Sequence, residues 1–167
     1  ALASLGAGAF SLAIFTDTDA STGAFTAGTI DIATSPTTLF TVTGMMPGDS
    51  GSATLTVENN GSGQLRYAMT SSSTDPDTKG LRDQLDMSIK AGACPGAGAD
   101  LSSGALSGAA FGDVAPGDDA GDRILDALTS EQLCFAWNLP LTTDNAYQGA
   151  TTTATFTFDA EQTANNP

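Results

Sequence analysis

The sequence contains no histidine. The common zinc peptidases need two histidines on one helical face and a glutamate base, and the chain cannot supply that set. Ser-His-Asp and Cys-His catalytic sites are excluded for the same reason. We therefore expect the chain not to be an enzyme and to require no cofactor.

Basic residues are scarce: five lysines and arginines stand against 19 acidic residues, for a net charge of −14. The basic residues form no cluster; they are Arg66, Lys79, Arg82, Lys90 and Arg123. Because such a surface repels a phosphate backbone, nucleic acid is not an expected partner. The negative charge is typical of a solvated coat that limits unwanted association.

Only two cysteines occur, Cys94 and Cys134. They could be a reduced buried pair, but the composition favours a single structural disulfide. Closing a loop of about 40 residues would stabilise the fold by roughly 4 kcal/mol in the chain-entropy model. Asn60 begins an Asn-Gly-Ser glycosylation sequon, and both features fit a secreted, extracellular protein.

The sequence also lacks a hydrophobic run long enough for a membrane helix; its longest uncharged apolar stretch is Ala1 to Phe15. A bilayer helix needs about 20 apolar residues, and this run is shorter and contains Gly6 and Gly8. We predict no stable membrane span. The run resembles the end of a secretory signal, but we expect it to remain in the mature protein.

This N-terminal arm, residues 1–15, has the alternation of a strand, with Phe10, Leu12 and Ile14 on one face. Its large apolar side chains are Leu2, Leu5, Phe10, Leu12, Ile14 and Phe15. Burying them would contribute on the order of 10 kcal/mol, so they need a cover. Two covers are open: the chain's own domain, or a neighbouring copy, which an extended arm of about 50 Å can reach.

The rest of the chain is rich in Gly, Thr, Ser and Ala and alternates in short segments. We predict strands at 25–32, 39–43, 53–57, 64–70, 87–91, 105–111, 133–139 and 151–159. One short helix is expected over 77–86, capped by Asp77 or Thr78. The pattern indicates an all-β, antiparallel, jelly-roll-like two-sheet sandwich over 24–167, joined to the arm by a hinge at 16–23.

Several motifs occur in one order over nearly the whole domain. They are FTDTD (15–19), FTAGTIDI (25–32), PGDSG (47–51), TVENNGS (56–62), LP (139–140), DNAYQG (144–149) and TFTFDAEQTANN (155–166). Together they resemble the TasA and camelysin family. DNAYQG followed by AEQTANN is the most specific part of the resemblance.

The resemblance implies a secreted jelly-roll protein, with relatives that build biofilm-matrix fibres or archaeal bundling pili. In such filaments each subunit donates its N-terminal strand to the next, and the matching donor here, by position, is Ala1 to Phe15. The implied partners are identical subunits, and beyond them neighbouring filaments or cells. A cell-surface binding module and a camelysin-like peptidase remain the alternatives.

Acidic residues crowd one loop of the chain: Asp113, Asp118, Asp119 and Asp122. Hard oxygen ligands of this kind can bind calcium, although the spacing does not match an EF-hand. The alternative is a loop whose charges simply keep it solvated.

Overall fold

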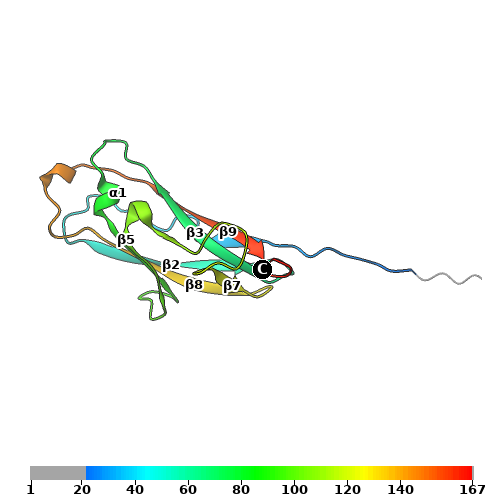
Figure 1. The fold of residues 1–167 in the computed structure, drawn as a ribbon. Coiled ribbons are helices and arrows are strands. Elements are labelled where there is room, and N and C mark those ends of the chain that lie inside the picture. The colour runs from blue at the N-terminus through cyan, green and yellow to red at the C-terminus, as the bar shows by residue number, and fades with distance from the viewer. Residues whose placement is uncertain (1–21, 167) are drawn as a thin grey trace, which may run out of the picture.

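The computed structural model describes residues 22–166, which fold into two stacked antiparallel sheets (Figure 1). In the first sheet the strand order is β1 (Ile32–Ser35), β2 (Ser50–Asn59), β8 (Ser130–Asn138), β4 (Asp86–Ala91) and β5 (Asp100–Ala105). In the second, β3 (Leu65–Ser73) pairs with β9 (Ala154–Gln162) along one edge, and with β6 (Ala110–Phe111) and β7 (Arg123–Leu125) along the other. This arrangement confirms the predicted all-β two-sheet sandwich.

The core lies between the sheets and follows the alternation of the sequence. On β8, Leu133 and Phe135 are completely buried, and they lie opposite Leu55 and Ala53 of β2. Val57, Leu65, Met69 and Ile89 are also wholly buried. The predicted strands at 53–57, 64–70, 87–91, 133–139 and 151–159 therefore correspond to β2, β3, β4, β8 and β9.

Strand β3 is covered on both faces, which its alternation does not predict. Leu65 and Tyr67 face the core, but Arg66, between them, is only 4% exposed. Its guanidinium lies 3.4 Å from a carboxylate oxygen of Glu161 and 3.6 Å from one of Asp118. The loop over residues 112–122 thus folds onto the outer face of the second sheet.

Two predicted strands are wrong. Residues 25–31 form no strand, because this segment is held only at its end, where Thr29 and Asp31 bond the turn after β2; the strand begins at Ile32. Residues 39–43 form none either, because the adjacent side chains of Leu39 and Phe40 both pack against the core, which an alternating strand does not allow.

The helix and the 105–111 strand are shorter than predicted. Helix α1 spans Leu81–Gln84 and starts after Gly80, whose φ of 71° is left-handed. Asp77 does not cap it, since its carboxylate accepts from the N–H of Lys79 and of Thr151. Between β5 and β6 the chain makes a 3₁₀ turn over Leu106–Gly108, which buries Leu106.

Strands β1 and β9 are edge strands of the two sheets. β1 ends the first sheet and β9 ends the second, and within residues 22–166 nothing pairs with the outer edge of either. An unpaired edge leaves a row of N–H and C=O groups available to another strand.

Candidate functional site: an apolar groove between two free strand edges

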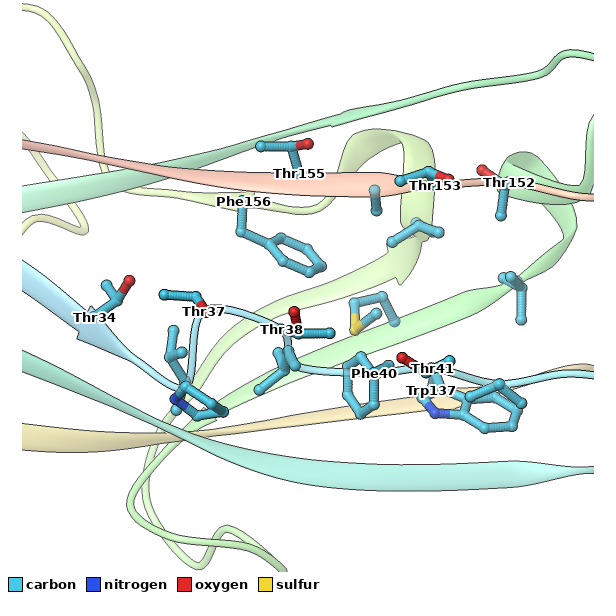
Figure 2. A pocket seen from close by; sticks show the side chains of 18 of the residues that line it. Thr34, Thr37, Thr38, Phe40, Thr41, Trp137, Thr152, Thr153, Thr155 and Phe156 are labelled. Carbon is cyan, nitrogen blue, oxygen red and sulfur yellow. The ribbon is translucent and has the colours of Figure 1, made fainter.

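A groove of about 540 Å³ lies between the two free edges (Figure 2). One wall is the end of β1 and the segment 36–45 that follows it, and the other is the beginning of β9. Its floor is apolar and comes from the core of the sandwich: Leu55, Leu85, Met87, Leu106 and Trp137. The groove is therefore an opening into the hydrophobic core along one side of the sandwich.

Threonines line both walls above this floor. Figure 2 shows Thr34, Thr37, Thr38 and Thr41 on one side, and Thr152, Thr153 and Thr155 on the other. Threonine combines a methyl group with a hydroxyl that both donates and accepts hydrogen bonds. An apolar floor with such a rim suits an extended peptide, whose alternate side chains point inward while its backbone needs polar partners.

Strand β9 presents aromatic rings to this opening. Phe156 and Phe158 are half-buried, whereas Thr155 and Thr157 are exposed. The ring of Phe156 packs 4.9 Å from that of Phe135 and extends into the groove (Figure 2). β9 is thus apolar on its inner face, polar on its outer face and free along one edge.

Trp137 lies toward one end of the groove and Phe158 toward the other. Trp137 is close to the end of β8 and pairs directly with Gly51 of β2. At the other end Phe158 contacts Tyr67, 5.9 Å between ring centroids. Tyr67 donates a hydrogen bond of 2.8 Å to Glu131, which also accepts from Arg123. Burial and the adjacent Glu131 carboxylate raise the pKa of Tyr67 well above its usual range, so it stays a neutral donor.

The sequence did not reveal this groove. Its walls come from residues 34–45 and 152–158, which are more than 100 positions apart. The sequence nevertheless contains two threonine-rich runs, at 34–41 and 151–158, and each of them includes phenylalanine. These two runs form the walls of the groove. The predicted arm residues Leu2, Leu5, Phe10, Leu12, Ile14 and Phe15 lie outside the described residues.

Residues 22–28, which lead from the arm into the domain, stay away from the sandwich. Residues 22–31 are all exposed, and Phe25 is 97% exposed. In Figure 1 this blue segment extends outward from the end of the molecule where the C-terminus lies. Only from Thr29 does the chain attach to its own domain, through hydrogen bonds with Ser62.

The two cysteines form a disulfide, as the sequence predicted. Cys134 faces outward from β8, and Cys94 is anchored by a 3.0 Å hydrogen bond from its N–H to Thr54 on β2. The bond therefore ties the 92–99 loop to the outer surface of the first sheet, away from the groove. Its function is structural in this arrangement.

The acidic loop uses its carboxylates internally. Asp122 accepts a 2.8 Å hydrogen bond from the N–H of Asp113, and Asp113 accepts from Ala115. Asp118 pairs with Arg66, and Asp119 accepts from Asp122 only through its backbone carbonyl. Calcium binding by this loop stays a prediction. Glycosylation of Asn60, which is exposed in the turn after β2, also stays one.

A family model described as camelysin metallo-endopeptidase matches residues 1–88. That is more than half of the 167 residues, and it includes the arm, β1, β2, β3 and one wall of the groove. The chain belongs to the camelysin family. The resemblance seen in the sequence motifs is thereby confirmed, while no curated protein matches the chain.

The description of the camelysin family implies a metal, and we tested whether the residues fit one. Between positions 22 and 166, no three acidic or cysteine side chains converge as a metal site would require. Both cysteines are occupied by the disulfide, and histidine is absent from the sequence. This part of the camelysin-family chain therefore does not fit a peptidase zinc ion. None of its helices is long and apolar enough to cross a membrane.

Proposed function

We propose that the protein is the subunit of an extracellular filament, in which the arm Ala1 to Phe15 of one copy inserts as a strand into the groove of the next. The observation that carries this proposal is the apolar groove with a free strand edge on either side. Phe40, Trp137 and Phe156 are only half-buried along this groove, so apolar surface stays in contact with water unless something fills it. A donated strand would fill it and pair with the exposed edges.

The arm and the groove have matching chemistry. Phe10, Leu12 and Ile14 recur at every second position of the arm, as do Ala154, Phe156 and Phe158 on β9. A strand added beside β9 would direct its apolar side chains to the same floor. The small residues between them, Ser11 and Ala13, would lie toward the threonine rim.

The exposed segment 22–28 supports donation over fold-back. A first strand of the same domain would have to return to the groove from the end at which this segment leaves. Residues 22–28 instead lead outward and bury none of their side chains on their own domain. The family membership and the disulfide support an extracellular location, since disulfides persist in oxidising compartments.

Electron microscopy of a variant that lacks Ala1 to Phe15 tests the proposal. We expect no filaments, and addition of the arm as a synthetic peptide should stabilise the variant without restoring polymerisation. The matched control retains the fifteen residues in an order that breaks their alternation, and it should also fail to assemble. Filaments formed by the deletion variant would reject the proposal, and a stable monomer of the intact chain would favour a surface module with its arm folded back.

The second candidate is the metallo-endopeptidase activity in the family description. We rank it lower because the chain contains no histidine and the described residues do not fit a zinc ion. Hydrolysis of a protein substrate that is lost on chelation and restored by zinc would favour it. Our proposal expects no such turnover.

A further inference from the structure

The two ends of the sandwich differ in the residues that they would present to a neighbouring copy. At one end, which we call the exit end, Ile32 of β1 pairs with Asn59, and residues 22–28 lead away from the domain. At the mouth end, Ser50 of β2 pairs with Asn138, and the groove is bordered by Val42, Met45 and Trp137. The ten residues of β2 separate these ends by about 30 Å.

Strand direction links the arm to one of these ends. β9 runs from the mouth end to the exit end, because Ala154 pairs with Ser73 and Gln162 with Leu65. An arm that folds back, or is exchanged in a closed dimer, enters at the exit end and runs parallel to β9. An arm that enters at the mouth end runs antiparallel to β9, and all copies then point the same way. Only this second arrangement is an open, head-to-tail polymer.

Head-to-tail stacking places two uncovered apolar features at the same junction. At the mouth end Met46 is 65% exposed and Leu141 is 83% exposed. The loops that carry them are fixed together by hydrogen bonds between Gly48 and Leu139 (2.7 Å) and between Leu139 and Asp49 (2.8 Å). Leu141 packs directly over Gly48, where a side chain would lie 2.8 Å from it.

At the exit end the corresponding feature is Phe25. It precedes by four residues the first attached residue, Thr29, so it stands within about 13 Å of its own domain. It is almost fully exposed and has no cover on the described part of its own chain. In a head-to-tail junction it would face the Met46 and Leu141 surface of the next copy.

We propose that Phe25 of one copy packs on Met46 and Leu141 of the copy that receives its arm, forming a second contact beside the inserted strand. This contact rests on the proposed function. The inserted strand would provide most of the attachment, and the Phe25 contact would fix how one domain is oriented on the next. Its partner is a second copy of this chain.

The test separates the contact from the strand. Phe25→Ser and Leu141→Ser should each raise the critical concentration for polymerisation, measured by sedimentation, about tenfold. The matched control is Val114→Ser, which changes a side chain that is 55% exposed on the loop over the second sheet. Polymerisation of both variants at the wild-type critical concentration would overturn the contact.

Two further measurements keep the outcome unambiguous. Full-length chain with Leu12→Asp, which should not polymerise, is titrated with a peptide of residues 1–15 while the fluorescence of Trp137 is followed. If Leu141→Ser, added to this chain, leaves the affinity for the peptide unchanged, then the Phe25 contact is separate from the groove. If the peptide does not bind at all, the proposed function itself is contradicted. In filaments of the double variant Phe25→Cys, Leu141→Cys, oxidation should give a ladder of linked chains; Phe25→Cys with Val114→Cys should give none.

Discussion

The indole ring of Trp137 occupies the space above Gly51, its direct partner on β2. A Cβ atom at position 51 would lie 2.9 Å from three atoms of the ring, closer than side chains approach one another. Since Trp137 lines the groove, the absence of a side chain at Gly51 helps to shape the groove floor. The tryptophan is also the only one in the sequence, so the tryptophan fluorescence of the protein comes from a residue that lines the groove.

We expect Gly51→Val to displace Trp137 and to destabilise the domain by about 1–3 kcal/mol, the usual effect of overpacking. Urea unfolding followed by fluorescence measures both the stability and the position of the ring. Ser52→Val is the control, because Ser52 is exposed on the opposite face of the same strand. Equal unfolding curves and unchanged emission for the Gly51 variant would contradict this account.

Removing the disulfide should lower stability without closing or opening the groove. The bond joins residues 40 positions apart, so Cys94→Ser with Cys134→Ser should cost about 4 kcal/mol. Thermal unfolding measures the loss, and the arm peptide should still bind at low temperature. Titration of the unreduced wild-type protein should detect no free thiol; two thiols would refute the pairing.

A charge in the arm should prevent assembly. In the proposed filament Leu12 is buried in the groove of the next copy, and an unpaired carboxylate there costs several kcal/mol. Leu12→Asp should therefore abolish filaments in electron micrographs, whereas Ser11→Thr on the other face should be tolerated. Normal polymerisation of the aspartate variant is the result that the proposal does not survive.

Acid should weaken the attachment of the 112–122 loop through Glu161. The N–H of Gly117, and then Asn166 and Arg66, hold the pKa of Glu161 below its ordinary value of 4.5. A lowered pKa means that the carboxylate stabilises the fold above pH 4.5 and that this contribution is lost as the pH falls through the folded-state pKa. Glu161→Gln should thus be less stable than wild type at pH 7, and the difference should shrink below pH 4.5.

The control for this pH dependence is Asp159→Asn, which removes an exposed carboxylate two positions earlier on β9. It should change the net charge equally while leaving the loop attached. Chemical denaturation of the three proteins between pH 3 and 7 gives the comparison. A Glu161 variant whose deficit is constant over this range would show that the carboxylate does not act through its charge.

The sequence predicted the sheets wherever one face of a strand is buried and the other is wet. On β2, Leu55 and Val57 alternate with threonines and Glu58, and the burial of the two apolar side chains follows directly. The prediction failed where distant parts of the chain cover a surface. Arg66 has the position of a solvent-facing residue, and it is buried because a loop some fifty residues later folds over it.

Of the proposed strand and groove, the sequence predicts only the strand. The alternation of residues 1–15 and their need for a cover are visible in the sequence, but the groove is formed by tertiary structure. The sequence pattern predicts a strand through Leu39 and Phe40, but both side chains pack against the core and form a wall of the groove instead. No local pattern places that wall opposite β9, because only the folding of both sheets brings them together.

The way the chain leaves its domain determines how the protein would bear mechanical load. Residues 22–31 continue directly into β1, and β1 lies along β2 in four consecutive antiparallel pairs, Ile32 with Asn59 through Ser35 with Thr56. Hydrogen bonds of an antiparallel ladder are perpendicular to the strands. A pull on the N-terminal segment along the strand direction therefore loads the hydrogen bonds between β1 and β2 in shear. The bonds then resist together and are not opened one at a time.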